Sequence, residues 1–323
     1  MKKYIFKRLL ASIPVFFGIT ILSFVIMRLA PGSPVDTVSM SPGVDTRARE
    51  RLYSSYGLER PLHIQYLSWL KRVVTLDFGE SFRDGEKVSS KIIERLPATL
   101  FLNLSALILI FSLSIPIGVI SAVKQNTIID RGLTFFVFLG YSIPSFALAL
   151  LLMYFFGLKL GWLPVSGIVS VNFEFLSPMG KLADIILHLI LPVMTLGLSG
   201  LAFISRYMRS SMLEVIGKDY IRAARARGVS EKSLIFNHAF KNALIPVVTM
   251  VGLLIPGLIG GSVVFETIFS WPGMGRLAYS AIMSRDYPVI MGVGVIMAVL
   301  TLLGNLLSDI GYAAVDPRIR YRS

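Results

Sequence analysis

Residues 96–123 read LPATLFLNLSALILIFSLSIPIGVISAV and contain no Asp, Glu, Lys or Arg. A helix rises about 1.5 Å per residue, so about 20 apolar residues cross the roughly 30 Å of hydrocarbon in a bilayer. This stretch is longer than that minimum. It therefore predicts a transmembrane helix.

Five further stretches are free of charge over a comparable length, which makes six predicted spans. The others are residues 9–27, 132–158, 185–205, 242–265 and 287–308. The whole chain of 323 residues is 54% hydrophobic and 16% charged, whereas roughly a quarter of residues are charged in soluble domains. The predicted fold class is an all-α polytopic membrane protein with six transmembrane helices.

The first span follows Lys and Arg residues, which is also typical of a signal peptide. Its apolar run is long for a signal peptide, and the sequence Pro31-Gly32-Ser33-Pro34 after it is a poor cleavage site. We interpret residues 1–28 as a short N-terminus and an uncleaved first span.

The distribution of Lys and Arg predicts the orientation. Seventeen lie at the N-terminus, between spans two and three, between spans four and five, and at the C-terminus, whereas four lie in the two short loops on the other side. Basic residues are retained in the cytoplasm, so both termini are predicted to be cytoplasmic. This retention also explains the net charge of +13 without a nucleic-acid partner.

Residues 29–95 are predicted to form a small helical segment on the extracytoplasmic side. Apolar residues from Leu62 to Val74 recur at helical spacing after Pro61. Asp45 is placed to cap a second short helix that runs to Tyr56.

The sequence argues against enzymatic catalysis and against a bound metal or cofactor in this chain. It contains no Gly-Lys-Ser/Thr phosphate-binding loop and no cysteine, and its three histidines lack the spacing of metal ligands. We therefore predict a protein that is not an enzyme, has no metal site and holds no cofactor of its own. No deeply placed carboxylate supports the ion relay of a secondary carrier.

Polar and proline residues within the spans are candidates for the pathway or its hinges. His188 is interpreted as a packing hydrogen-bond donor or, alternatively, as a substrate contact. A proline removes a backbone hydrogen bond and favours a kink, although prolines are also common in membrane helices. The candidate set is Pro144, His188, Pro192, Pro246 and Pro256.

The predicted cytoplasmic loop, about residues 206–241, contains a short helix from Asp219 to Arg227. Asp219 favours a helix start, and Gly228 can supply the left-handed residue that ends the helix. Ser230 offers an N-cap for a second helix that leads into the fifth span. A helix of this length needs a surface to pack against, and a partner protein and anionic lipid headgroups are both compatible with its alanines and arginines.

The run from Arg222 to Gly228, with Ala223 and Ala224, resembles the Glu-Ala-Ala-x-x-x-Gly loop of ABC importer permeases. Other stretches resemble the dipeptide and oligopeptide branch of that family over nearly the whole chain. They are YGLERP (56–61), IPIG (115–118), GYSIP (140–144), LPVSG (163–167), ETIFSWPG (266–273), RDYP (285–288) and DPRIR (316–320).

The sequence departs from the general family pattern at three places. Arg222 replaces the Glu of the loop motif, and the Ile-x-Leu-Pro expected after Gly228 is missing at the usual spacing. The Pro-Gly-Asp-Pro after the first span reads PGSP (31–34). These differences put in doubt any individual contact carried over from sugar importers.

The resemblance implies a type I ABC importer permease in the bacterial cytoplasmic (inner) membrane. Its transmembrane domain would cover residues 96–312, followed by a cytoplasmic tail at 313–323. Implied partners are a second homologous permease, two ATPase subunits that bind ATP and Mg²⁺, an extracytoplasmic solute-binding protein and membrane lipid. The short helix would be the coupling helix, and its docking residues would be Tyr220, Arg222, Ala223, Ala224 and Gly228.

The implied substrate is a peptide, driven by ATP hydrolysis in the partner subunits. Nickel and glutathione permeases of the same family are alternatives, and an ion-coupled secondary carrier is a further one. No motif in the sequence separates these substrates.

Overall fold

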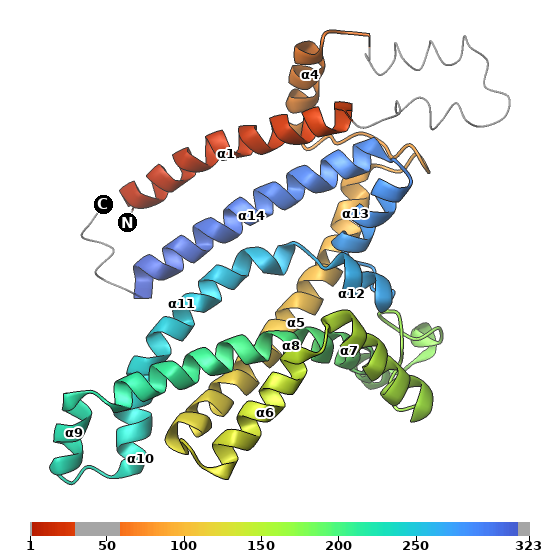
Figure 1. Cartoon of the computed structure of the whole chain (residues 1–323). Coiled ribbons are helices and arrows are strands. Elements are labelled where there is room, and N and C mark those ends of the chain that lie inside the picture. The colour runs from red at the N-terminus through yellow and green to blue at the C-terminus, as the bar shows by residue number, and fades with distance from the viewer. Residues whose placement is uncertain (1, 30–58, 316–323) are drawn as a thin grey trace.

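The computed structural model describes residues 2–29 and 59–315, and this part of the chain is helical (Figure 1). Its α-helices are α1 (Lys2–Leu29), α4 (Leu62–Val74), α5 (Val88–Val123), α6 (Ile128–Ser142), α7 (Ser145–Leu152), α8 (Pro178–Ile216), α9 (Asp219–Ala226), α10 (Glu231–Ser233), α11 (Phe240–Ile259), α12 (Val263–Ile268), α13 (Met274–Met283) and α14 (Tyr287–Val315). Two π-helical segments, η1 (Met153–Lys159) and η3 (Leu234–Ala239), and the 3₁₀ turn η2 (Phe173–Phe175) join them. The all-helical prediction is confirmed.

Within the described residues, four helices are long and apolar enough to cross a membrane: α1, α5, α8 and α14. The pair formed by α6 with α7 and η1 would make a fifth, but it bends by 99°. The predicted span over residues 132–158 is therefore divided at Pro144, one of the prolines that the sequence indicated as a candidate for a kink. Pro144 has no N–H to donate and disfavours the helical conformation of Ile143, so the helix ends at Ser142.

The predicted fifth span, residues 242–265, is also divided. Helix α11 ends at Ile259, and Gly261 has a positive φ of 62° before α12 begins at Val263. The left-handed conformation at Gly261 is incompatible with a continuing right-handed helix.

Helices α5 and α8 lie side by side in the same direction and form the centre of the fold (Figure 1). A Cβ on Gly118 would lie 2.6 Å from the Cβ of Met208, and a Cβ on Gly197 would lie 2.5 Å from Leu109. Ser114 Oγ donates a hydrogen bond across the contact to Leu201 O at 3.2 Å. Small residues let these two backbones approach closely, as is common in membrane helix pairs.

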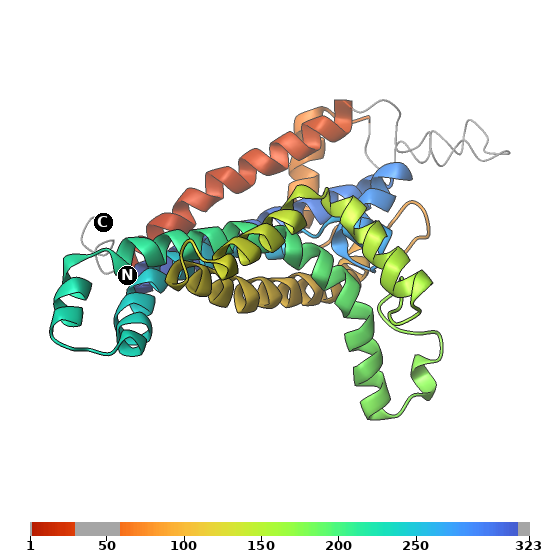
Figure 2. The same cartoon turned by 60° about the horizontal axis from the view of Figure 1, so that its bottom comes forward.

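Helix α1 lies outermost, against α14 (Figures 1 and 2). Arg8 contacts Asp309 at 3.2 Å, and Phe24 packs edge-on against Tyr66 of α4. The helix predicted after Pro61 is thereby confirmed as α4. The one predicted from Asp45 to Tyr56 lies outside the described residues.

The elongated body has two ends (Figure 2). The α9 end carries α9, α10 and η3, together with the start of α1 and the finish of α14. The α12–α13 end carries α12, α13 and α4, and the segment between η1 and α8 extends from the body there.

Candidate functional site

Helix α9 spans Asp219–Ala226, which confirms the predicted short helix to within one residue. Asp219 lies in its first turn and Arg225 in its last, so both charges match the helix dipole. Ile221 and Ala224, three residues apart on one face, are buried in a cluster with Met212 and Leu234. This packing supplies the stability that an eight-residue helix lacks by itself.

The end of α9 is a Schellman turn built on Gly228. The Gly228 N–H donates to Arg225 O at 3.0 Å, and the Val229 N–H donates to Ala224 O at 3.3 Å. Gly228 has a φ of 81°, as the sequence predicted. No atom lies within 4 Å of the position a Cβ would take, so this position requires glycine for its backbone conformation and not for space.

The predicted docking residues divide between two faces. Tyr220, Arg222, Ala223 and Gly228 are exposed, whereas Ala224 is buried beneath α9. Of the two alanines among the predicted docking residues, only Ala223 therefore lies on the outer surface.

Helix α9 is also tied to the start of α11. Asn242 Nδ2 donates to Tyr220 Oη at 3.1 Å and to His238 O at 2.8 Å. The second helix begins as expected with Ser230 at its N-cap position, but the serine side chain makes no capping bond there. The Ser230 carbonyl instead accepts the Leu234 N–H at 2.9 Å, and the chain continues through η3 into α11.

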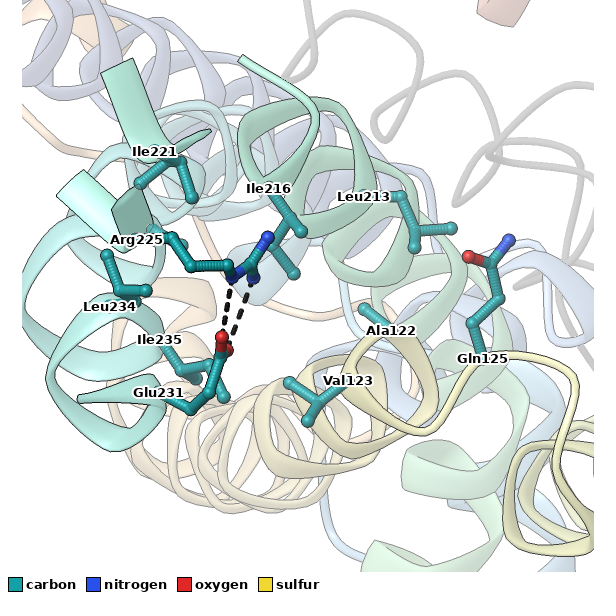
Figure 3. Close-up of a pocket in the computed structure, with 11 residues that line it drawn as sticks. Ala122, Val123, Gln125, Leu213, Ile216, Ile221, Arg225, Glu231, Leu234 and Ile235 are labelled. Atoms are coloured by element: carbon teal, nitrogen blue, oxygen red, sulfur yellow. Dashed lines mark hydrogen bonds and ion pairs between the residues drawn. The ribbon is translucent and has the colours of Figure 1, made fainter. Parts of the chain in front are cut away.

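An ion pair joins the two sides of the Gly228 turn. Arg225 Nε and Nη2 contact the two carboxylate oxygens of Glu231 at 2.5 Å and 3.2 Å (Figure 3). Hydrogen bonding from Arg225 lowers the pKa of Glu231, and the same bond raises the pKa of Arg225. We call this pair the Arg225–Glu231 clasp.

The clasp lies beside a cavity of about 240 Å³ (Figure 3). Its walls come from the end of α5, the end of α8, α9, and the segment from α10 into η3. The walls are mostly apolar and include Ala122, Val123, Leu213, Ile216 and Leu234. Ile221 of α9 and Leu234 of η3 line this cavity and also belong to the buried cluster, so the cavity lies beside the inner face of α9.

The pathway and hinge candidates lie on separate elements. Pro144 is exposed at the bend between α6 and α7, and Pro192 is buried within an unbroken α8. Pro246 lies in α11 with Pro256, whose side chain is outside the described part. His188 is buried in α8, with Nδ1 2.8 Å from Asp184 O and 3.6 Å from Asp184 Oδ1.

Three buried carboxylates at the α12–α13 end have no role predicted from the sequence. Glu266 accepts Thr99 Oγ1 at 3.0 Å and the Arg276 N–H at 2.8 Å. A Cβ on Gly273 would lie 2.4 Å from Glu266, so the backbone closes directly around its carboxylate. The sequence signal that could have identified Glu266 is an acidic residue placed between an apolar run and Pro272-Gly273.

The other two carboxylates have the same type of partners. Asp184 accepts the N–H and Oγ–H of Ser170 at 2.8 Å and 2.5 Å. Asp286 accepts Ser81 Oγ at 2.5 Å and the Phe82 N–H at 3.1 Å. Each of the three carboxylates thus accepts one hydroxyl and one backbone N–H from outside its own helix or turn.

At the α9 end, Asp130 at the start of α6 pairs with Arg209 of α8. Arg209 Nε and Nη2 contact the two Asp130 oxygens at 3.0 Å and 2.8 Å. Among the residues that the structure describes, no three His, Asp or Glu side chains gather as a metal site.

Comparison with known proteins places these features in one family. Residues 114–321 match the family described as binding-protein-dependent transport system inner membrane component, and residues 1–103 match its N-terminal counterpart. The oligopeptide transport system permease protein AppB of Bacillus subtilis is 49% identical over 322 residues, which cover 99% of this chain and 100% of that protein.

More distant relatives agree over the full length. The di/tripeptide transport system permease protein DppB of Pseudomonas aeruginosa is 39% identical, and the dipeptide transport system permease protein DppB of Escherichia coli is 38% identical, each over 100% of both chains. A chain in an inward-facing structure of the MetNI methionine ABC transporter superposes with a TM-score of 0.53 at 21% identity, covering 70% of this chain and 96% of that one. This structural likeness concerns the fold alone.

Proposed function

The chain belongs to the inner membrane components of binding-protein-dependent transport systems and is a multi-pass permease of a peptide ABC importer, and on this premise we propose how it works. It is a transporter and not an enzyme, and this subunit carries no cofactor. We propose that it forms half of a translocation pathway with a second, similar permease. Two ATPase subunits bind ATP and Mg²⁺, and an extracytoplasmic binding protein delivers the peptide.

The proposed membrane arrangement has six spans: α1, α5, the bent pair from α6 to η1, α8, α11 and α14. The α9 end faces the cytoplasm with both termini, and the α12–α13 end with α4 faces outward. The excess of Lys and Arg at the α9 end supports this orientation. The exposed apolar side chains along α1 suit contact with lipid.

The observation that carries the coupling proposal is the construction of α9. A short helix is fixed by two buried side chains and a Schellman turn, while Tyr220, Arg222, Ala223 and Gly228 remain on its outer surface. We propose that this surface docks on an ATPase and that Ala224 supports it from beneath. ATP-driven movement of the ATPases then shifts the permease between inward-open and outward-open states.

Reconstitution tests this function directly. The permease, its genomic neighbour permease, the ATPases and the binding protein are placed in proteoliposomes with ATP, and uptake of labelled dialanine and tetraalanine is measured. We expect ATP-dependent uptake that does not require an ion gradient. Uptake that follows a proton or sodium gradient without ATP would contradict the proposal.

Substrate class is tested on the isolated binding protein. We expect di- to pentapeptides to raise its melting temperature, and we expect nickel and glutathione not to do so. Stabilisation by nickel or glutathione alone would assign this importer to those substrates instead.

A further inference from the structure

We propose that the Arg225–Glu231 clasp is a positioning device that makes α9, α10 and η3 move as one body, so that force on α9 reaches α11. This inference rests on the proposed coupling function. It concerns two residues that are not among the proposed docking residues.

The covalent path from α9 to α11 contains a flexible point. Gly228 lies between α9 and α10 at a φ of 81°, and no side chain restricts its neighbourhood. A glycine in this conformation can change its dihedrals with little steric cost. The two hydrogen bonds of the Schellman turn, from the Gly228 N–H to Arg225 O and from the Val229 N–H to Ala224 O, are then the local backbone restraint on a tilt of α9 relative to α10.

The cavity gives α9 room for such a tilt. Ile221 and Ala224 hold the inner face of α9 against the core, but Ile221 also lines the space of about 240 Å³ between α9, η3 and the end of α5, so part of this face has no atoms packed beneath it (Figure 3). A push on α9 would then be absorbed by closing the cavity.

The clasp spans both the turn and the edge of this space. Arg225 lies in the last turn of α9, and Glu231 is the first residue of α10, which continues through η3 into α11. Two parallel N–H···O contacts fix orientation as well as distance, because a guanidinium and a carboxylate are both planar. The Tyr220–Asn242 hydrogen bond provides a second tie between α9 and α11.

Static stability is not the main role of the clasp. The Arg225 and Glu231 side chains are 48% and 62% exposed, and exposed ion pairs contribute little to folding. A pair of this kind can nevertheless define the orientation of α9 relative to α10, in addition to the buried cluster that contains Ile221, Ala224 and Leu234.

Charge exchange tests the proposal in the complete importer in proteoliposomes. Arg225→Glu and Glu231→Arg are measured singly and together for uptake of labelled dialanine and tetraalanine, for ATP hydrolysis, and for the amount of copurified ATPase. We expect each single variant to retain the ATPases but to lower the ratio of peptide transported to ATP hydrolysed by roughly fivefold or more. The double variant should recover most of that ratio, because it restores the pair.

Lys218 and Glu214 offer a matched control in the same loop. They form an exposed ion pair at 2.9 Å between the last turn of α8 and the N-cap position of α9, and the pair does not cross the Gly228 turn. Exchange of these two charges, singly or together, should leave the transport ratio unchanged.

Three results would contradict the proposed role of the clasp. They are a normal ratio in both single variants, a double variant no better than the single ones, and loss of copurified ATPases that the double variant does not restore. The last result would make Arg225 a docking contact. If the wild-type complex itself showed no ATP-driven uptake, the proposed function would fail and not the clasp alone.

Discussion

The two ends of the molecule hold their loops by different chemistry. At the α9 end, Arg–carboxylate pairs such as Arg225–Glu231 and Arg209–Asp130 connect the segments. At the α12–α13 end, the buried carboxylates of Asp184, Glu266 and Asp286 accept hydroxyl and backbone N–H groups. Both side chains of the Arg225–Glu231 pair are exposed, whereas the Asp130 carboxylate and the carboxylates of the second kind are buried.

Exposed ion pairs suit an end of the molecule that moves, whereas buried carboxylates suit an end that stays fixed. Exposed ion pairs exchange partners at little cost, because water and other charges replace the lost contact. A buried carboxylate surrounded by neutral donors has no such replacement, so its loss leaves buried donors unsatisfied. The following predictions test that contrast, from the largest expected effect to the smallest.

Glu266→Ala should have the largest effect. It removes the acceptor of Thr99 Oγ1 and of the Arg276 N–H and opens a void beneath Gly273. We expect a loss of about 2–4 kcal/mol, since each unsatisfied buried donor costs roughly 1–3 kcal/mol. The measurement is the melting temperature of the purified protein in detergent. Glu174→Ala is the control at the same end, because the Glu174 side chain is 84% exposed, and it should leave that temperature unchanged.

Gly228→Val should break coupling while the protein remains in the membrane. A β-branched residue at a φ of 81° costs about 1–3 kcal/mol, which is enough to misplace α9 without unfolding the long helices. Copurified ATPases and ATP-driven peptide uptake should both fall, at a near-normal membrane level. Gly228→Asn is the control, because Asn tolerates the left-handed conformation and should retain uptake. Normal transport by the Val variant would rule out α9 as the mechanical link.

Asp130→Asn should have an intermediate effect, about 1 kcal/mol, because it weakens charge-assisted hydrogen bonds between α6 and α8. The measurement is the melting temperature of the purified protein in detergent at pH 7, compared between the variant and the wild type. An unchanged melting temperature would show that this pair does not contribute to stability.

Glu214→Gln should have the smallest effect. It removes an exposed ion pair with Lys218 at the junction of α8 and α9, and the hydrogen bond from the Lys218 ammonium to Glu214, which raises the pKa of Lys218, is weakened with it. We expect no measurable change in melting temperature, ATPase copurification or uptake. A clear loss of ATPase would instead mark Glu214 as part of the docking surface.

The sequence by itself determined the long apolar helices and the short helix α9. Stretches without charge must be helical in lipid, because each backbone polar group has to find its partner within the segment. The end of α9 at Gly228 could also be predicted from the local sequence, because it depends on the backbone conformation of one residue next to a helix end. These features need no knowledge of what packs where.

Only the tertiary structure decided where the predicted spans are interrupted and which distant segments contact each other. Pro144 and Pro192 both lie in predicted spans, yet the helix ends before the first and continues through the second. Neighbouring helices in a bundle can satisfy the groups that a proline frees, so its local effect does not fix the outcome. Ala224 and Ala223 are likewise adjacent in sequence, and only the packing of α9 buries one and exposes the other.

The enclosed carboxylates show the same limit most clearly. Glu266 and Thr99 are 167 residues apart, and Asp286 and Ser81 are 205 apart. No periodicity or spacing along the sequence indicates that two such distant residues form a hydrogen bond. Helix propensity and hydropathy are sums over neighbours in sequence, whereas a buried hydrogen bond depends on which distant segments the packed helices bring together.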